Sequence, residues 1–211
     1  MNTLYLLRIL LLILIFAFPI SAMACEDNKT YTVGVQNIDY SPHYNFLSDD
    51  NTSFFNQFIK WLAVKTGCKI EVVSLPIKRL HLAYERQQHI DFIYPDNPNW
   101  RPTSELNSGI KNRIYSKPLT TALGTTIVSQ SNENIFLSDF MLLAFPRGFT
   151  PAAWLALQAN NKVTFKEVSD AKSALLMVQS NRVDGADIEY NVAQYLINKY
   201  DLTPMVVAKN L

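Results

Sequence analysis

Three consecutive segments decide the fold of this chain: Lys69-Ile-Glu-Val-Val-Ser74, Pro76 to Gln87, and Ile90-Asp-Phe-Ile-Tyr94. The first and third are short and rich in β-branched or aromatic residues, which is typical of strands. The middle segment begins with proline and is long enough for a helix of about three turns. A strand, a helix and a strand in this order predict a parallel strand pair with a right-handed crossover.

The residues before this stretch add one more strand and one more helix. Thr32 to Gln36 has the composition of a strand, and Ser53 can cap a helix that Gly67 can end. Between these two residues, apolar side chains recur at the spacing of one helix face. They are Phe55, Phe58, Ile59 and Leu62. The order β-α-β-α-β predicts a parallel sheet covered by helices.

The second half of the chain repeats this alternation. The expected strands are 142–145, 163–168 and 186–188. The expected helices begin at Thr150-Pro151, with Thr as N-cap, at Ser169 or Asp170, and at Tyr190. Because the two α/β units are separated near residues 117–124, we expect an α/β protein of two lobes with a cleft between them.

The first 24 residues have the features of an export signal. Arg8 is the only charge, residues 9–19 are uncharged and apolar, and Ala22-Met-Ala24 fits the small-x-small pattern of a cleavage site. The alternative is an anchoring helix, for which the apolar run is short. We therefore predict a signal peptide at residues 1–24 and a periplasmic protein.

The charge balance excludes some classes of partner. The chain has 19 basic and 18 acidic residues, and cleavage removes Arg8, so the mature protein has equal numbers of both. This balance gives no electrostatic reason to expect a nucleic acid or an anionic membrane surface as partner. The three histidines have no metal-ligand spacing, and the sequence has no phosphate-binding glycine loop or nucleophile elbow. We expect no metal, no cofactor and no catalytic residue.

Two cysteines, Cys25 and Cys68, each precede an expected strand of the first unit. If these strands are parallel neighbours, the two cysteines lie at the same edge of the sheet. In an oxidising compartment such a pair predicts a disulfide, which would stabilise the fold by roughly 4 kcal/mol by restricting the unfolded chain. The alternatives are a lipid on Cys25 as first mature residue, or two free thiols.

Six different short patterns follow one another along the chain. They are Tyr31-Thr-Val-Gly-Val-Gln, Asp39-Tyr-Ser-Pro-His-Tyr, Gln88-His-Ile-Asp-Phe-Ile, Arg113-Ile-Tyr-Ser-Lys-Pro-Leu, Arg147-Gly-Phe-Thr-Pro and Asn181-Arg-Val-Asp-Gly-Ala-Asp-Ile-Glu. In this order and spacing the chain resembles the bacterial extracellular solute-binding proteins of family 3. The resemblance implies the type II periplasmic clamshell fold, with mostly parallel sheets.

The resemblance also suggests boundaries for the parts of the chain. We predict the first lobe at 25–119, the second lobe at 120–204, and the start of a return hinge at 205–211. In the family the chain then re-enters the first lobe and adds further helices. Most of that segment is missing from this sequence, so a truncated product and a minimal form are both open.

In parallel α/β sheets, ligands bind beyond the carboxyl ends of the strands. In the first lobe the family places an aromatic ring before Ser-Pro against the ligand, which here is Tyr40. It also places an arginine after the third strand, where a planar guanidinium grips a ligand carboxylate. Arg101 is that candidate, and Asp96 and Trp100 of the same loop are predicted to line the site. Arg113 competes with Arg101 for this role.

In the second lobe the resemblance implies two further ligand contacts. Thr150 matches the Thr of a Gly-x-Thr pattern, which with free N–H groups at a helix start receives an anionic group. Glu189 follows Asp184 by the spacing at which the family has an acidic residue for the ligand's amino group. Glu is longer than the more common Asp, which leaves room for a different cation.

The leading functional prediction is capture of a small polar, amino-acid-like solute by cleft closure. The expected partners are the small-molecule ligand and an inner-membrane ABC-type permease, or a sensor receptor in an alternative reading. The protein is expected to be a monomer and not an enzyme. The other alternative is an enzyme on the same fold, because some periplasmic dehydratases of prephenate-like acids resemble these proteins. Asp96 or Glu189 would then supply the acid or base.

Overall fold

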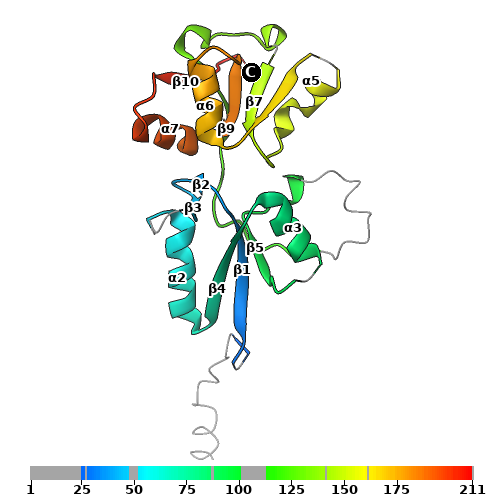
Figure 1. The fold of residues 1–211 in the computed structure, drawn as a ribbon, viewed down its shortest axis with the longest axis vertical. Coiled ribbons are helices and arrows are strands. Elements are labelled where there is room, and N and C mark those ends of the chain that lie inside the picture. Colours follow the sequence, from blue (N-terminus) through cyan, green and yellow to red (C-terminus); the bar gives the residue numbers. More distant parts are fainter. Residues whose placement is uncertain are drawn as a thin grey trace, which may run out of the picture.

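The computed structural model describes residues 25–26, 28–47, 52–86, 88–100, 113–140, 142–160 and 162–210. These residues form two α/β lobes, joined by the segment that leads from residue 113 into strand β6 (Gly124–Ser129) (Figure 1). The predicted signal peptide at 1–24 lies outside the described residues. Among the described helices, none combines the length and apolar character needed to cross a bilayer.

The first lobe contains a three-stranded parallel sheet in the order β4-β1-β5. Its elements are β1 (Thr30–Gln36), α2 (Phe54–Thr66), β4 (Lys69–Leu75), α3 (Ile77–Glu85) and β5 (Phe92–Tyr94). The helices cover opposite faces of the sheet (Figure 1). Val33 and Val35 share a core with Phe55 of α2, whereas a side chain at Gly34 would collide with Leu80 of α3. The predicted β-α-β-α-β unit is therefore confirmed.

Helix α2 begins and ends where the sequence predicts. Ser53 is its N-cap, and Gly67 ends it in the left-handed conformation with φ of 70°, donating its N–H to the Ala63 carbonyl. The Ser53 hydroxyl does not cap the helix, because it donates to Asn56 Oδ1 and accepts from the Asn45 N–H. These bonds fasten α2 to the loop that carries Asn45.

That loop contains a small antiparallel hairpin, β2 (Asp39–Tyr40) and β3 (Tyr44–Asn45), which the sequence did not predict. Asn56 of α2 donates its side-chain amide to the Asn45 carbonyl at 3.0 Å. Tyr44 is buried against Tyr94 of β5, with ring centroids 5.7 Å apart. The hairpin is therefore held on both sides, and it carries Tyr40 to the boundary between the lobes.

The second lobe contains a five-stranded sheet in the order β10-β6-β9-β7-β8. Its further elements are η2 (Gln130–Asn132), η3 (Leu137–Asp139), β7 (Leu142–Pro146), η4 (Ala152–Trp154), α5 (Leu155–Ala159), β8 (Thr164–Val168), α6 (Ala171–Gln179), β9 (Gly185–Glu189), α7 (Tyr190–Lys199) and β10 (Met205–Val207). Strands β7, β8 and β9 are parallel, while β6 and β10 are antiparallel to their neighbours. The two lobes thus have the predicted α/β architecture with mostly parallel strands.

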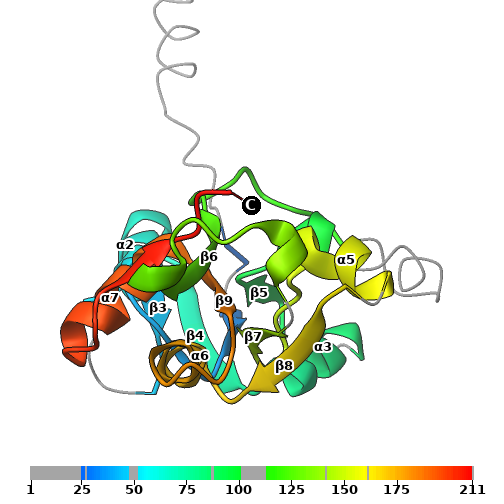
Figure 2. The same ribbon diagram turned by 90° about the horizontal axis from the view of Figure 1, so that it is seen from above.

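Helices α6 and α7 cover one face of this sheet and η4 with α5 the other (Figure 2). On the first face, Leu175 of α6 and Leu196 of α7 pack on Ala186 of β9. On the second face, the Trp154 ring lies 4.8 Å from the Phe140 ring, and its Nε1–H donates to Thr126 Oγ1 at 3.2 Å. Each face of the sheet therefore has its own buried core.

The start of the helix after β7 differs from the sequence prediction. Pro151, not Thr150, is the N-cap residue, and the first turn, η4, is a 3₁₀ turn without a side-chain cap. The Thr150 carbonyl accepts the Ala152 N–H, which closes a tight turn before the helix. The predicted cap at Asp170 is correct, since its carboxylate accepts the Ser173 N–H at 2.7 Å.

The last described residues lie in the second lobe. Strand β10 pairs with β6, and Asn210 forms a bridge with Phe136. Lys209 Nζ is 2.8 Å from Glu133 Oε1 on the same side of the lobe. The sequence assigned 205–211 to the start of a return hinge, and the structure places 205–207 in the ladder of the second sheet.

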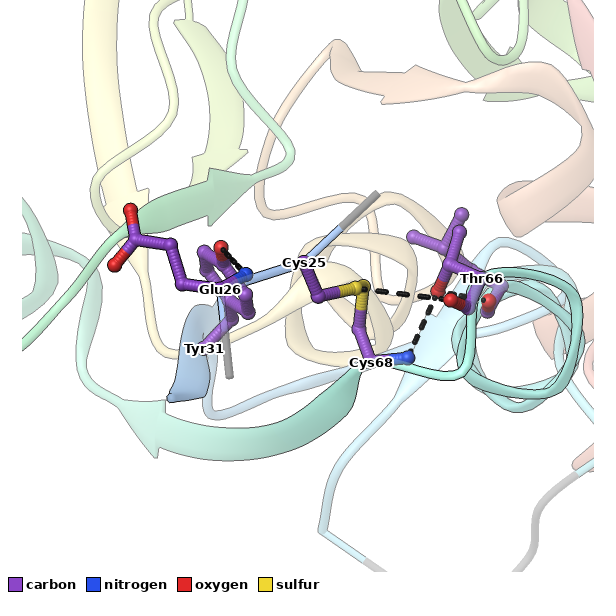
Figure 3. Close-up of a disulfide and its surroundings, with 6 residues drawn as sticks. Cys25, Glu26, Tyr31, Thr66 and Cys68 are labelled. Carbon is purple, nitrogen blue, oxygen red and sulfur yellow. Dashed lines mark hydrogen bonds between the residues drawn. A yellow bond between two sulfur atoms is a disulfide. The ribbon is translucent and has the colours of Figure 1, made fainter. Parts of the chain in front are cut away.

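The predicted disulfide between Cys25 and Cys68 is present (Figure 3). Their Cα atoms are 5.6 Å apart, and both lie at the amino ends of neighbouring strands, because Thr30 pairs with Lys69. The Cys68 N–H donates to Thr66 Oγ1 at 3.2 Å (Figure 3). The bridge therefore ties the start of the described chain to the end of α2, far from the boundary between the lobes.

Candidate ligand site between the lobes

The carboxyl ends of strands from both lobes meet at one place. Strand β1 leads into the hairpin with Tyr40 and His43, β7 leads to Phe149, and β9 ends at Glu189. The Tyr40 ring lies 5.0 Å from the Phe149 ring, and His43 Nε2 lies 3.0 Å from Glu189 Oε2. Three loops for which the sequence predicted ligand contacts, those of Tyr40, Thr150 and Glu189, therefore come together at one place.

Tyr40 is the aromatic centre of this site. Its ring is largely buried, and it also contacts the Tyr44 ring at 5.4 Å. Burial raises the pKa of the Tyr40 phenol strongly, and the negative charges of Glu189 and Asp187 raise it further. A hydrogen bond from the Glu189 backbone acts in the opposite direction. The pKa of Tyr40 in the first lobe thus depends on both carboxylates of β9 in the second lobe.

Glu189 is buried and is the N-cap of α7. Its Oε2 accepts the Val192 N–H at 2.9 Å, and its Oε1 accepts from Asn191 Nδ2 at 2.9 Å and from the Leu123 N–H at 3.2 Å. These donors satisfy much of the hydrogen-bonding capacity of a carboxylate. Glu189 therefore holds the end of β9, the start of α7 and the segment between the lobes together.

His43 lies against Glu189 from the opposite lobe. Although the two atoms are 3.0 Å apart, their direction of approach is not that of a hydrogen bond, and His43 Nε2 is buried without a hydrogen-bond partner in the described part of the chain. A protonated imidazole would form an ion pair with the carboxylate here. His43 therefore brings a side chain of the first lobe against the Glu189 carboxylate of the second lobe.

Asp187 is a second carboxylate of β9 at this site, and sequence reasoning missed it. It is largely buried, it forms no hydrogen bond or ion pair with a described residue, and desolvation raises its pKa to about 6. Strand alternation could have revealed it, because Asp187 and Glu189 lie on one face of β9 while Ala186 and Ile188 enter the core on the other.

The rim of the site joins the lobes by one ion pair and one close packing contact. Lys199 Nζ of α7 donates to Asp39 Oδ2 of β2 at 2.9 Å, which raises the lysine pKa. Burial alone would raise the pKa of Asp39, but hydrogen bonds from Ser41 and Lys199 outweigh it and lower that pKa. Gly148 lies so close to Ile77 of α3 that no Cβ would fit between them.

The loop after β5 does not bring its predicted residues to these carboxylates. Asp96 forms an ion pair with Arg113, whose guanidinium also bonds Glu85 at 3.1 Å and lies over the Tyr84 ring. Arg113 is therefore committed to partners within its own lobe. Trp100 lies in η1 (Pro98–Trp100) and is partly exposed. Arg101 lies outside the described residues, so its predicted role stays a prediction.

The predicted anion site at Thr150 lacks the helix that it needs. Thr150 is exposed, and the helical residues after it form a 3₁₀ turn and the short helix α5. Arg147 next to it is exposed and pairs with Glu167 at 3.2 Å. The described residues therefore offer no free cation and no long helix N-terminus here. Nor does any group of three metal-ligating side chains occur within the described ranges.

No family model matches the sequence, and no curated protein matches it. Solved structures do. A histidine kinase sensor domain with similarity to periplasmic binding proteins has a TM-score of 0.67 at 16% identity, covering 85% of this chain and 76% of its own. The ancestral amino acid-binding protein AncCDT-1, a precursor of cyclohexadienyl dehydratase, has a TM-score of 0.64 at 23% sequence identity. The match covers 85% of this chain and 77% of that one.

The substrate-binding protein of an amino acid ABC transporter has a TM-score of 0.61 at 18% identity, covering 86% of this chain and 78% of that one. At these identities the likeness defines the fold. The chain has the two-lobed clamshell fold of periplasmic binding proteins, with mostly parallel sheets, as the sequence predicted. Its candidate site lies where the strand ends of the two lobes face each other.

Proposed function

We propose that this chain is a periplasmic solute-binding protein of family 3 type, which captures a small polar, amino-acid-like solute between its lobes. The observation that carries the proposal is the convergence of Tyr40, Phe149 and Glu189 from three strand ends of two lobes. Ligands of open α/β sheets bind beyond such strand ends. The aromatic pair supplies contact area, and the carboxylates supply charge.

Binding requires the lobes to separate and close again. Separation breaks the contacts of His43 with Glu189 and of Lys199 with Asp39, which are few and lie at the boundary. The segment 113–123 is the described connection on which the lobes would turn, and Tyr94 is hydrogen-bonded to Thr120 within it. A ligand that replaces His43 at Glu189 would restore the lost pairing and favour the closed form.

The closed form would then be recognised by a partner. We propose an ABC-type permease as that partner, in line with the neighbour from an amino acid transporter. The sensor-domain neighbour favours a second candidate, in which closure acts on a signalling receptor. Both roles rest on the same capture step.

A third candidate is catalysis, supported by the neighbour that is a precursor of a dehydratase. Asp96 and Glu189, the two acid–base candidates from the sequence, are held by Arg113 and by N–H donors respectively. Asp187 is the better candidate, because its pKa of about 6 suits proton transfer near neutral pH. We propose binding without conversion as the main function.

The test is equilibrium dialysis of protein exported to the periplasm of a bacterial host, against mixed amino acids, amines and organic acids. Mass spectrometry identifies the retained compound and any product. A retained and unchanged solute, lost in Tyr40→Ala but kept in the matched surface variant Tyr200→Ala, is the expected result. A converted compound would favour the enzyme, and no retained compound would overturn the proposal.

A further inference from the structure

We propose that the ligand of this site carries an ammonium or guanidinium group that pairs with Asp187, and that the site prefers amines to solutes that need a carboxylate partner. This inference rests on the proposed function, and it narrows the amino-acid-like solutes to amines that lack the carboxylate of an amino acid. It assigns Asp187, and not only Glu189, as the residue that determines charge specificity.

The position of Asp187 places its carboxylate at the boundary between the lobes. It lies near the carboxyl end of β9, directly opposite Thr126 of β6 in the ladder. Thr126 accepts the Trp154 indole N–H, so this face of the sheet is otherwise aromatic and closed. Tyr40 of the other lobe is close enough for its phenol to be perturbed by the Asp187 charge.

The contrast between the two carboxylates of β9 indicates which one is available. Glu189 accepts hydrogen bonds from three N–H donors and faces His43. Asp187 is largely buried and has no hydrogen-bond or ion-pair partner among the described residues. An unpaired carboxylate is costly to bury, and buried charges are normally paired. A ligand cation would supply the missing partner.

The aromatic rings of the site suit the same group. Tyr40 and Phe149 come from opposite lobes and approach to 5.0 Å between ring centroids. An ammonium or guanidinium group is attracted to the face of such rings, and more strongly where water is excluded. Closure of the lobes would bring both rings and the carboxylate onto one cation.

The pairing of the described cations at the boundary favours an amine over a carboxylate-bearing ligand. In the described part of the chain the cationic side chains at this boundary are Lys199, bonded to Asp39, and His43, against Glu189. Arg147 and Arg113 are paired elsewhere with Glu167 and Asp96. To meet a cation of the described residues, a ligand carboxylate would have to break one of these pairs, whereas an amine meets Asp187 without breaking any.

The test is isothermal titration calorimetry of the exported protein with agmatine, putrescine, arginine and glutamate at pH 8. We expect agmatine or putrescine to bind more tightly than glutamate. We expect Asp187→Asn to weaken binding of that amine by roughly tenfold or more, the scale of one charged hydrogen bond. The control is Asp201→Asn, which makes the same charge change at an exposed residue whose φ of 49° suits asparagine.

The outcomes separate the two proposals. Glutamate as the tighter ligand, or an amine that binds Asp187→Asn unchanged, would overturn the assignment of Asp187 and leave the binding function standing. Arginine that binds more tightly than agmatine would overturn the preference for amines over carboxylate-bearing solutes. No binding of any of the four, together with no retained solute in dialysis, would overturn both. If Asp187→Asn does not fold, putrescine is compared with 1,4-butanediol on the unmodified protein, and equal affinity would overturn the cation requirement.

Discussion

At the scale of single residues, Asp187 and Glu189 differ although they lie two positions apart on one strand. Glu189 is fixed by its role as a helix cap, and its donors come from the first turn of α7 and from Leu123. Asp187 lies one pleat earlier, beyond reach of these donors. The family pattern identifies the first and says nothing of the second, because a pattern records position and charge but not the partners that a side chain meets.

The Asp187 carboxyl predicts a pH dependence of stability. Burial raises its pKa in the folded state from 3.8 to about 6, so the folded protein binds this proton more tightly than the unfolded chain does. The stability gained from that proton is complete below about pH 4 and is lost as the pH rises through 6. Asp187→Asn should therefore be more stable than the unmodified protein at pH 8, by roughly 1–3 kcal/mol. The difference should close on acidification to pH 4.

Urea unfolding at both pH values measures this difference, with Asp201→Asn as control. The contact of His43 with Glu189 is common to all three proteins, so its contribution cancels in the comparison. A difference that stays constant between pH 4 and pH 8 would contradict the burial of a free carboxyl at Asp187.

At the scale of elements, the sequence predicted the parts with strong periodicity and clear caps. Helix α2 lies between Ser53 and Gly67, and Asp170 is the N-cap of α6, as expected. Strand β6 was not predicted, because its short β-branched run directly follows residues 117–124, which were interpreted as the separator of the two lobes. The strands of the β2–β3 hairpin are too short to show the alternation of polar and apolar residues that predicts a strand, and their pairing depends on tertiary contacts with α2.

Thr150 shows why a local motif was insufficient. Threonine before proline is a frequent helix start, but here the chain makes a tight turn to bring Gly148 against Ile77 of the other lobe. The close approach of two lobes is a tertiary constraint that no sequence window contains. The same is true of His43, whose importance arises only when Glu189 lies opposite.

The second face of the large sheet depends on one hydrogen bond between elements. Trp154 is buried, and its indole N–H donates to Thr126 Oγ1 at 3.2 Å. Trp154→Phe should leave the threonine hydroxyl without this donor and lower the free energy of unfolding by about 1–3 kcal/mol, including the lost ring area. Trp61→Phe on the exposed side of α2 is the control and should have little effect in the same urea titration.

At the scale of the whole molecule, the disulfide and the boundary between the lobes lie at opposite ends of the first lobe. Protein from an oxidising compartment should have no free thiol at Cys25 or Cys68. Reduction should lower stability by roughly 4 kcal/mol, as expected for a loop of this length. Mass spectrometry after alkylation without reduction checks the first point. Two alkylated cysteines, or a lipid on Cys25, would contradict it.

The contact that sets how closely the lobes approach is Gly148 against Ile77. Gly148 has φ of 83°. A Cβ at Gly148 would overlap Ile77 Cγ2 and come close to Ile77 Cβ, so the lobes would have to move apart. Gly67 has a similar φ of 70° but open space around it. Both alanine variants incur the cost of the left-handed conformation, about 1 kcal/mol, and only Gly148→Ala also disturbs closure.

Small-angle X-ray scattering separates these two effects. Gly148→Ala should have a larger radius of gyration than both the unmodified protein and Gly67→Ala, and it should bind the identified solute more weakly, because the rings of Tyr40 and Phe149 no longer meet. Equal radii and equal affinities for the two variants would show that the lobes can close without the fit at Gly148. Since the candidate site is formed only by that closure, its affinity should follow the distance between the lobes.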